Sequence, residues 1–168
     1  QQNFGNPSSL HAYGRAAHTA LETARGQVAG LIGARAAEIV FTGGATEANN
    51  LALRGVTGAL AEHKRHLIVS AVEHAAILEP ARALQRAGWA LDVVGVDGSG
   101  LVDPADVRRA LRDDTALVSI MHANNEVGTI QPIAEIAALA HARGALMHTD
   151  AAQTAGKIAV NVDALGVD

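Results

Sequence analysis

Short apolar runs alternate with helix-forming segments along the whole of this 168-residue sequence. The apolar runs cover residues 39–41, 67–69, 90–96, 117–121 and 145–147. Strands that alternate with helices favour a parallel sheet, because each parallel strand needs a crossover connection back to the same end of the sheet. The sequence therefore predicts an α/β fold, with a mainly parallel sheet flanked by helices.

The segments between these runs carry residues that begin and end helices. Apolar residues recur at helical spacing from Ala17 to Leu31, and Gly33 follows as a stop signal. Further helices are expected from Ala45 to about Leu60, between Pro80 and Gly88 with the proline in the first turn, from Pro104 behind an Asp103 cap, and between Pro132 and Gly144.

Four polar clusters stand where expected strands end, at residues 42–46, 73–74, 124–126 and 149–153. In open parallel α/β sheets, ligands bind in the crevice outside the carboxyl ends of the strands. Because the carboxyl ends of parallel strands share one edge of the sheet, we expect the four clusters to form a single site.

The first cluster is a glycine turn that leads into a helix. Gly43 and Gly44 let backbone N–H groups approach a ligand, the helix N-terminus carries positive partial charge, and Thr46 adds a hydroxyl donor. These features favour an anion site. An ordinary strand-to-helix turn capped by threonine is the alternative, since the segment matches neither the P-loop nor the dinucleotide-binding pattern.

The other clusters also allow two interpretations each. Asp150 is expected either to pair with a protonated ring nitrogen or to cap a helix, and Gln153 either to donate to a ligand oxygen or to complete that cap. His74 offers a ring that titrates near neutrality and can stack, or it is a strand-end histidine satisfied by the backbone. Asn125 is a ligand group or a turn residue.

Composition excludes several classes of function. The chain has no cysteine, which excludes disulfides, thiolate metal sites and a thiol nucleophile within these residues. Its net charge of -4 includes no basic run, which argues against a nucleic-acid partner. The histidines lack the spacing of a metal site, so we expect none. With no apolar stretch of about 18 residues and no recognisable signal peptide, we expect a cytoplasmic protein without a membrane partner.

Five strings of this sequence, taken together, resemble the cysteine desulfurases of the class V aminotransferase group. These enzymes use pyridoxal 5′-phosphate (PLP) on the type I fold. The strings occupy residues 4–11, 41–50, 73–74, 122–128 and 148–153. They follow the order and spacing of the family, and the resemblance covers essentially the whole chain.

The resemblance implies a cofactor site made of Ala45, Thr46, His74, Asn125, Asp150 and Gln153. Ala45 and Thr46 would hold the PLP phosphate, in agreement with the anion site expected at the helix N-terminus. His74 would stack on the pyridine ring and assist proton transfers, which makes it the candidate catalytic residue. Asn125 and Gln153 would hydrogen-bond the 3′ oxygen of the ring.

Asp150 would pair with the pyridinium nitrogen and so deepen the electron sink of the cofactor. The implied reaction converts L-cysteine to alanine and passes the sulfur, as a persulfide, towards iron–sulfur clusters or thio-cofactors. The resemblance also implies a homodimer and a sulfur-acceptor or scaffold partner.

The sequence departs from the family pattern because it lacks the string that carries the Schiff-base lysine. The family's Schiff-base lysine stands in a Ser-x-His-Lys string after the segment that holds Asp150 and Gln153, and no such string occurs here. Lys157 lies too early and is interpreted as a surface lysine. We therefore expect residues 1–168 to be part of the large PLP-binding domain, without the N-terminal segment, the lysine region or the small domain. The alternatives are a non-catalytic fragment or assembly unit, or another class V enzyme such as selenocysteine lyase.

Overall fold

A four-stranded parallel sheet forms the centre of the computed structural model, which describes residues 4–168. The strands are β1 (His66–Ser70), β2 (Ala90–Val94), β3 (Thr115–Ser119) and β4 (Leu146–His148). Their order in the sheet is β2-β1-β3-β4, and every pairing is parallel. The expected α/β architecture with a parallel sheet is confirmed.

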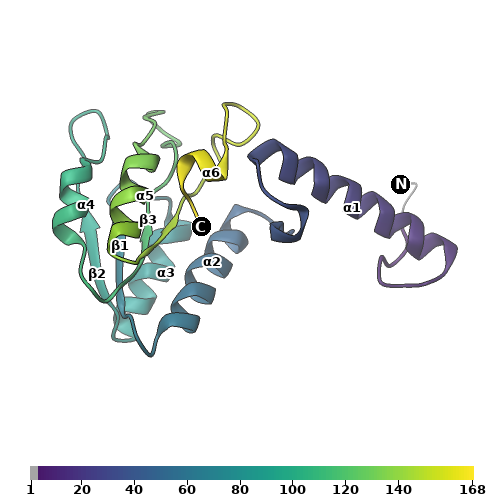
Figure 1. The fold of residues 1–168 in the computed structure, drawn as a ribbon, viewed down its shortest axis with the longest axis horizontal. Coiled ribbons are helices and arrows are strands. Elements are labelled where there is room, and N and C mark those ends of the chain that lie inside the picture. The colour runs from purple at the N-terminus through teal and green to yellow at the C-terminus, as the bar shows by residue number, and fades with distance from the viewer. Residues whose placement is uncertain (1–3) are drawn as a thin grey trace.

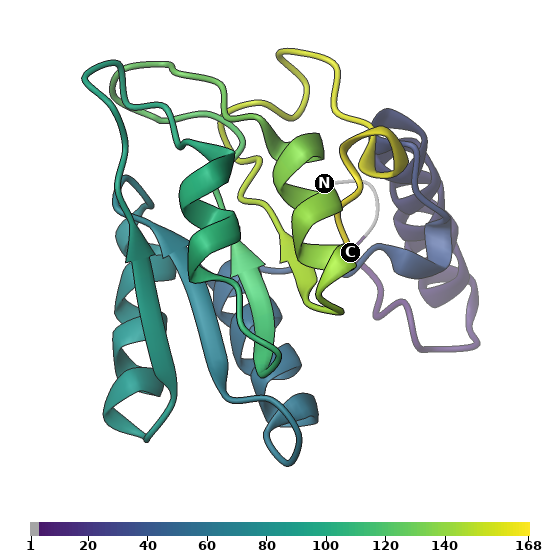
Figure 2. The same ribbon diagram turned by 60° about the vertical axis from the view of Figure 1, so that its left-hand side comes forward.

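Helices cover both faces of this sheet (Figures 1 and 2). Helices α2 (Ala45–Leu60) and α3 (Ala75–Arg86) lie on one face, and α4 (Pro104–Ala110) and α5 (Ile133–Ala142) lie on the other. The remaining helices are α1 (Ala12–Ile32), the 3-10 helix η1 (Ala36–Glu38) and α6 (Val162–Leu165). Side chains alternate between the two faces of a strand. Leu67 and Val69 of β1 accordingly pack on α2 and α3, whereas Ile68 faces the cluster built by α4 and α5.

The first helix stands apart from this layered body (Figure 1). It ends as expected at Gly33, which adopts a left-handed conformation with φ 73° and donates its N–H to the Ala29 carbonyl. The N-terminal arm, which we define as residues 4–32, keeps large apolar side chains in solvent. Phe4, Leu10 and Tyr13 are 75%, 88% and 64% exposed.

The apolar run at residues 39–41 does not form a strand, so that expectation is wrong. Val40 is 67% exposed and Phe41 is 43% exposed. Within residues 4–168 no strand pairs with this run, and without a partner the extended backbone gains no ladder hydrogen bonds. Arg25 partly covers it instead, donating to the Ile39 carbonyl and lying 5.0 Å from the centre of the Phe41 ring.

The third helix begins earlier than the sequence indicated. Pro80 lies inside α3 rather than in its first turn, because His74 caps the helix and Ala75 begins it. A proline in a helix interior lacks the N–H that would bond to the carbonyl four residues before it. Here Pro80 is buried, and the helix packs its apolar side on the sheet around Ile77 and Ala81.

Other helix boundaries agree with expectation. The carboxylate of Asp103 accepts from the backbone N–H of Ala105 at 2.8 Å and caps α4, and Pro132 directly precedes α5. Within residues 4–168, no helix combines the length and the apolar character needed to cross a membrane.

Candidate functional site

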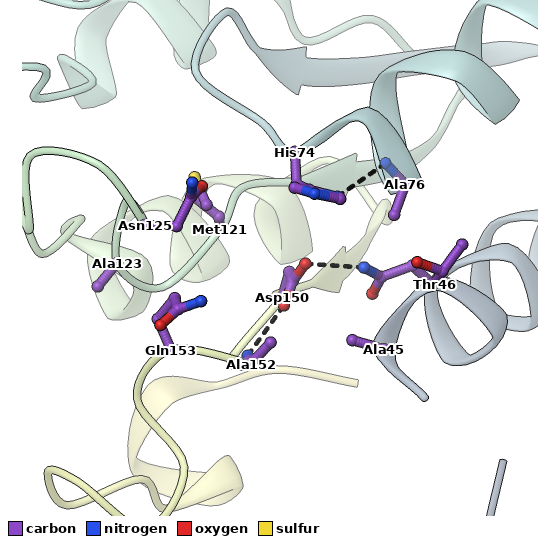
Figure 3. A pocket seen from close by; sticks show the side chains of 11 residues that line it. Ala45, Thr46, His74, Ala76, Met121, Ala123, Asn125, Asp150, Ala152 and Gln153 are labelled. Atoms are coloured by element: carbon purple, nitrogen blue, oxygen red, sulfur yellow. Dashed lines mark hydrogen bonds between the residues drawn. The ribbon is translucent and has the colours of Figure 1, made fainter. Parts of the chain in front are cut away.

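One cavity lies where the carboxyl ends of β1, β3 and β4 meet the start of α2 (Figure 3). It is lined by Ala45, Thr46, Asn49, His74, Ala76, Met121, Ala123, Asn125, Asp150, Ala152 and Gln153. All six residues that the resemblance assigned to the cofactor are among them. The structure thus brings the four polar clusters together, as the sheet topology predicted, while the individual roles of the six residues stay predictions.

Beyond β3, residues 120–122 continue to pair with the segment that follows β4, and this pairing fixes the position of Asp150 relative to Met121. The N–H of Ile120 donates to the carbonyl of His148 at 3.2 Å, and the N–H of His122 donates to the carbonyl of Asp150 at 2.9 Å. Because these bonds extend the β3–β4 pairing, the segments that carry Met121 and Asp150 leave the sheet side by side.

The glycine turn before α2 has a backbone that other residues avoid. Gly44 precedes the helix with φ 157° and ψ 176°, a region that is accessible essentially to glycine alone. A Cβ atom there would meet no other atom within 4 Å, so the backbone conformation and not the space requires glycine. The first N–H groups of a helix have no intrahelical acceptor, which leaves those of Ala45 and Thr46 to bind an anion in the cavity.

The carboxylate of Asp150 is held at both oxygens. Its Oδ1 accepts from the N–H of Ala152 at 2.9 Å, and its Oδ2 accepts from Nδ2 of Asn49 at 2.7 Å (Figure 3). Asp150 does not cap a helix, because residues 152–157 form turns. The two hydrogen bonds leave further lone pairs on each oxygen and fix the orientation of the group in the cavity.

Asn49 is a site residue that the sequence interpretation missed. It is only 5% exposed and lies on α2, three positions after Thr46 and four after Ala45. Residues at that spacing share one face of a helix. The helical period therefore carried the signal that Asn49 faces the same cavity as the anion-binding turn.

His74 combines two of its expected interpretations. Its Nδ1 accepts from the N–H of Ala76 at 3.1 Å, so the ring caps α3, and the same ring lines the cavity (Figure 3). A ring nitrogen that accepts a hydrogen bond carries no proton. The neutral ring therefore has its proton on Nε2, which is the nitrogen left to exchange a proton with a ligand.

The turn after β3 presents Asn125 to the cavity because its neighbour builds the turn. Oδ1 of Asn124 accepts from the N–H groups of Glu126 and Val127 at 2.9 and 3.0 Å. Nδ2 of the same side chain donates to the carbonyl of Val72 at 3.1 Å. Asn124 is thus a structural residue, and Asn125 is the one that lines the cavity.

Gln153 does not form a capping box. Its Oε1 accepts from Nζ of Lys157 at 3.1 Å, so its amide nitrogen is the group available to donate to a ligand. Lys157 is exposed and does not line the cavity, which agrees with its interpretation as a surface lysine.

Two histidines near the sheet, the buried His122 and the half-buried His148, each have a ring nitrogen within hydrogen-bond distance of a hydroxyl group. Nδ1 of His122 contacts Oγ1 of Thr154 at 2.9 Å, and Nδ1 of His148 contacts Oγ of Ser119 at 2.8 Å. Burial lowers the pKa of both rings, that of His148 to about 4, against a smaller rise from the Asp150 charge. Both are therefore neutral structural groups near pH 7. Within residues 4–168, no three His, Asp or Glu side chains gather as a metal site.

Comparison with known proteins gives consistent matches. Residues 1–168 match the family described as aminotransferase class-V. The chain is 52% identical over 168 residues to cysteine desulfurase IscS of Dictyoglomus turgidum, which is 100% of this chain and 43% of that protein. It is 46% identical over 167 residues to cysteine desulfurase IscS 1 of Archaeoglobus fulgidus, covering 99% of this chain and 44% of that protein.

Two solved structures are similar over nearly the whole chain. A NifS-like protein superposes with a TM-score of 0.96 at 39% identity, covering 100% of this chain and 47% of that one. The structure of SspA in complex with cysteine superposes with a TM-score of 0.95 at 40% identity, covering 99% of this chain and 48% of that one. The chain thus spans less than half the length of each of these four proteins.

Proposed function

The chain belongs to the class-V aminotransferase family, and from that premise we propose that it is the cofactor-binding part of a PLP-dependent cysteine desulfurase. The observation that carries the proposal is the cavity itself. It unites a helix N-terminus, a fixed carboxylate, two side-chain amides and an imidazole at one edge of a parallel sheet. The residues lie in part of the large PLP-binding domain.

These groups fit the chemistry of PLP. The phosphate has a match in the free N–H groups of Ala45 and Thr46 at the start of α2. The ring nitrogen has a match in the Asp150 carboxylate, and the 3′ oxygen has donors in the amides of Asn125 and Gln153.

Each lining residue then has a defined task. Asp150 binds the protonated ring nitrogen, and the bound cofactor supplies an electron sink for the substrate amino acid. His74 lies at the cavity wall and moves a proton at Nε2, since its Nδ1 is occupied by the cap of α3. Ala45 and Thr46 orient the cofactor through its phosphate.

The proposed substrate is L-cysteine, and the structure of SspA in complex with cysteine supports that choice. In the overall reaction, the C–S bond of the substrate breaks and its Cβ takes a proton, which leaves alanine. The sulfur passes to a cysteine thiolate as a persulfide, from which an acceptor or scaffold protein takes it for iron–sulfur clusters or thio-cofactors. Residues 1–168 contain no cysteine, so we assign that thiolate, and the lysine that anchors the cofactor, to other residues of the complete protein.

We also propose that the complete protein is a homodimer joined in part through the N-terminal arm. The arm leaves Phe4, Leu10 and Tyr13 exposed beside a helix that stands apart from the body (Figure 1). Exposed apolar patches of this kind mark interaction surfaces. The segment before α1 is an ordered turn, in which the Asn6 side chain accepts from the N–H of Ser8 at 2.9 Å.

The test uses the complete protein, incubated with L-cysteine and a reductant while alanine and sulfide are measured. We expect equal amounts of both products, and borohydride reduction should fix PLP to a lysine outside residues 1–168. Trapping at Lys157 would contradict the assignment. A marked preference for selenocysteine would favour selenocysteine lyase, and the absence of PLP binding would favour a non-catalytic unit.

A further inference from the structure

A buried carboxyl joins the ends of the two central strands directly behind the cavity. Glu73 precedes His74 and is 6% exposed. Its Oε1 accepts from the hydroxyl of Ser70 at 2.6 Å and from the backbone N–H of Met121 at 2.7 Å. Ser70 is the last residue of β1, and Met121 follows β3 and lines the cavity. One oxygen atom thus fixes both strand ends.

The other oxygen of this carboxyl has no partner. Oε2 of Glu73 is the buried side-chain polar atom in residues 4–168 that lacks any hydrogen bond. Burying a polar group without a partner costs free energy, and buried polar groups in native proteins are nearly always paired. The unpaired Oε2 therefore carries a cost, which the two hydrogen bonds accepted by Oε1 offset by pairing the buried donors of Ser70 and Met121.

A second contact ties the same two segments. The side chain of Asn124 donates to the carbonyl of Val72, two residues beyond Ser70 in the turn that leads to His74. Together with the Glu73 bonds, this contact locks the turn that carries His74 to the turn that carries Asn125. Both of those residues line the cavity.

Resting on the function proposed above, we propose that Glu73 is a positioning residue of the cofactor site. By holding the Met121 peptide and the Ser70 hydroxyl with one oxygen, it fixes the His74 ring relative to the turn of residues 121–125. It touches neither cofactor nor substrate. Its effect on binding and reaction passes through the backbone positions of the residues that do.

The protonation state of this carboxyl is coupled to the charge of Asp150 in the cavity. Burial raises the pKa of Glu73 to about 7, the hydrogen bonds from Ser70 and Met121 lower it, and the Asp150 charge raises it. The charged group that acts on it is the Asp150 carboxylate, which follows β4. Glu73 is therefore mainly protonated, and so mainly uncharged, at pH values below its raised pKa.

The test measures the affinity of the complete apo-protein for PLP in variants at this position, by titration with PLP at a pH of about 6.5. Glu73→Ala removes the acceptor of two hydrogen bonds and should weaken PLP binding by about tenfold or more. Glu73→Gln keeps an acceptor oxygen for both donors and should restore the affinity to within about threefold. Glu62→Ala, at an exposed glutamate beyond α2, is the matched control and should bind like wild type.

Ser70→Ala covers the case in which Glu73→Ala fails to fold. This variant removes one of the two donors to Oε1 but keeps the Glu73 side chain, so it leaves no cavity in place of the carboxyl group. It should weaken PLP binding by about threefold to tenfold. Wild-type affinity in Glu73→Ala or in Ser70→Ala, or equal losses in Glu73→Ala and Glu73→Gln, would overturn the positioning role alone. A wild-type protein that binds no PLP would overturn the proposed function as well.

Discussion

The side-chain amide of Asn49 donates to Oδ2 of Asp150 across 2.7 Å and joins residues 101 positions apart in the sequence. Asn49 lies on the first turns of α2, whereas Asp150 follows β4. The bond therefore ties the end of the cavity at the start of α2, where we propose that the phosphate binds, to the end that carries the carboxylate. A ligand with a phosphate and a protonated ring meets both groups at a fixed separation.

Removing this tie should weaken the site without abolishing it. In Asn49→Ala, Asp150 keeps its bond from the N–H of Ala152 but loses the bond at Oδ2, so its carboxylate can rotate. A hydrogen bond to a charged group contributes about 1.5–3 kcal/mol, so we expect a loss of roughly tenfold to a hundredfold in kcat/KM. Steady-state kinetics of the complete protein with L-cysteine would measure it. The neighbouring Asn50→Ala, which loses only a bond to the Thr46 carbonyl and one with Arg54, should cost much less.

The role of His74 can be separated from its structural cap. In His74→Gln the ring nitrogen that moves the proton is lost, and the rate of the chemical step should fall by about 10²–10⁴-fold. His74→Asn should be equally slow yet keep the melting temperature, because asparagine is a favoured N-cap residue. Single-turnover kinetics with cysteine isolate the chemical steps from product release. Wild-type rates in both variants, with a slightly lower melting temperature in His74→Gln, would reduce His74 to a helix cap.

Glu73 should give the stability of the protein a distinctive dependence on pH. Its carboxyl ionises near its ordinary pKa of 4.5 in the unfolded chain but at about 7 in the fold, so the folded state holds the extra proton between these values. Stability from this group is fully present below pH 4.5 and is lost as pH rises through 7, by about 3 kcal/mol.

His148 acts in the opposite sense, because its pKa falls from 6.5 to about 4 in the fold, and the stability that it contributes is lost as pH falls through that window. The two effects overlap in wild type, so the difference from Glu73→Gln is the informative quantity. Melting temperatures of the apo-protein should show wild type losing stability relative to Glu73→Gln from pH 5 to 8. A constant difference would show that Glu73 does not keep its proton.

The exposed arm predicts an effect on assembly. Leu10→Glu combined with Tyr13→Glu places charges on the apolar surface at the start of α1, and we expect it to convert the proposed dimer to monomers. Val93→Glu alters a 52% exposed apolar residue on β2, on the opposite side of the molecule, and serves as the control (Figure 1). Light scattering would measure the masses. A dimer that survives the double substitution would place the interface elsewhere.

Much of the site could be predicted because its polar residues follow directly after the strands. In a parallel sheet all carboxyl ends share one edge, so residues such as His74 and Asp150 meet there without any knowledge of side-chain contacts. Local signals were also sufficient for the Asp103 cap of α4 and the Gly33 stop of α1, because each acts on backbone groups a few positions away.

The remainder depended on contacts between distant segments. The run at residues 39–41 is as apolar as a strand, but strand formation needs a neighbour, and composition cannot supply one. The helical period places Asn49 on the cavity side of α2, but its bond to Asp150 and the bond of Glu73 to Met121 join distant segments, which the sequence does not show to be neighbours. The predicted start of α3 at Pro80 was wrong because His74 caps the helix and Ala75 begins it.

The most direct test of the proposed site is Asp150→Asn in the complete protein, with bound PLP and the turnover of L-cysteine measured on the same sample. An amide cannot keep the ring nitrogen protonated, whereas the substitution leaves the proposed phosphate site at Ala45 and Thr46 unchanged. We therefore predict PLP occupancy close to wild type together with a loss of turnover of about 10²-fold or more. Wild-type turnover with PLP bound would contradict the assignment of Asp150 to the ring nitrogen, and with it the account of this cavity.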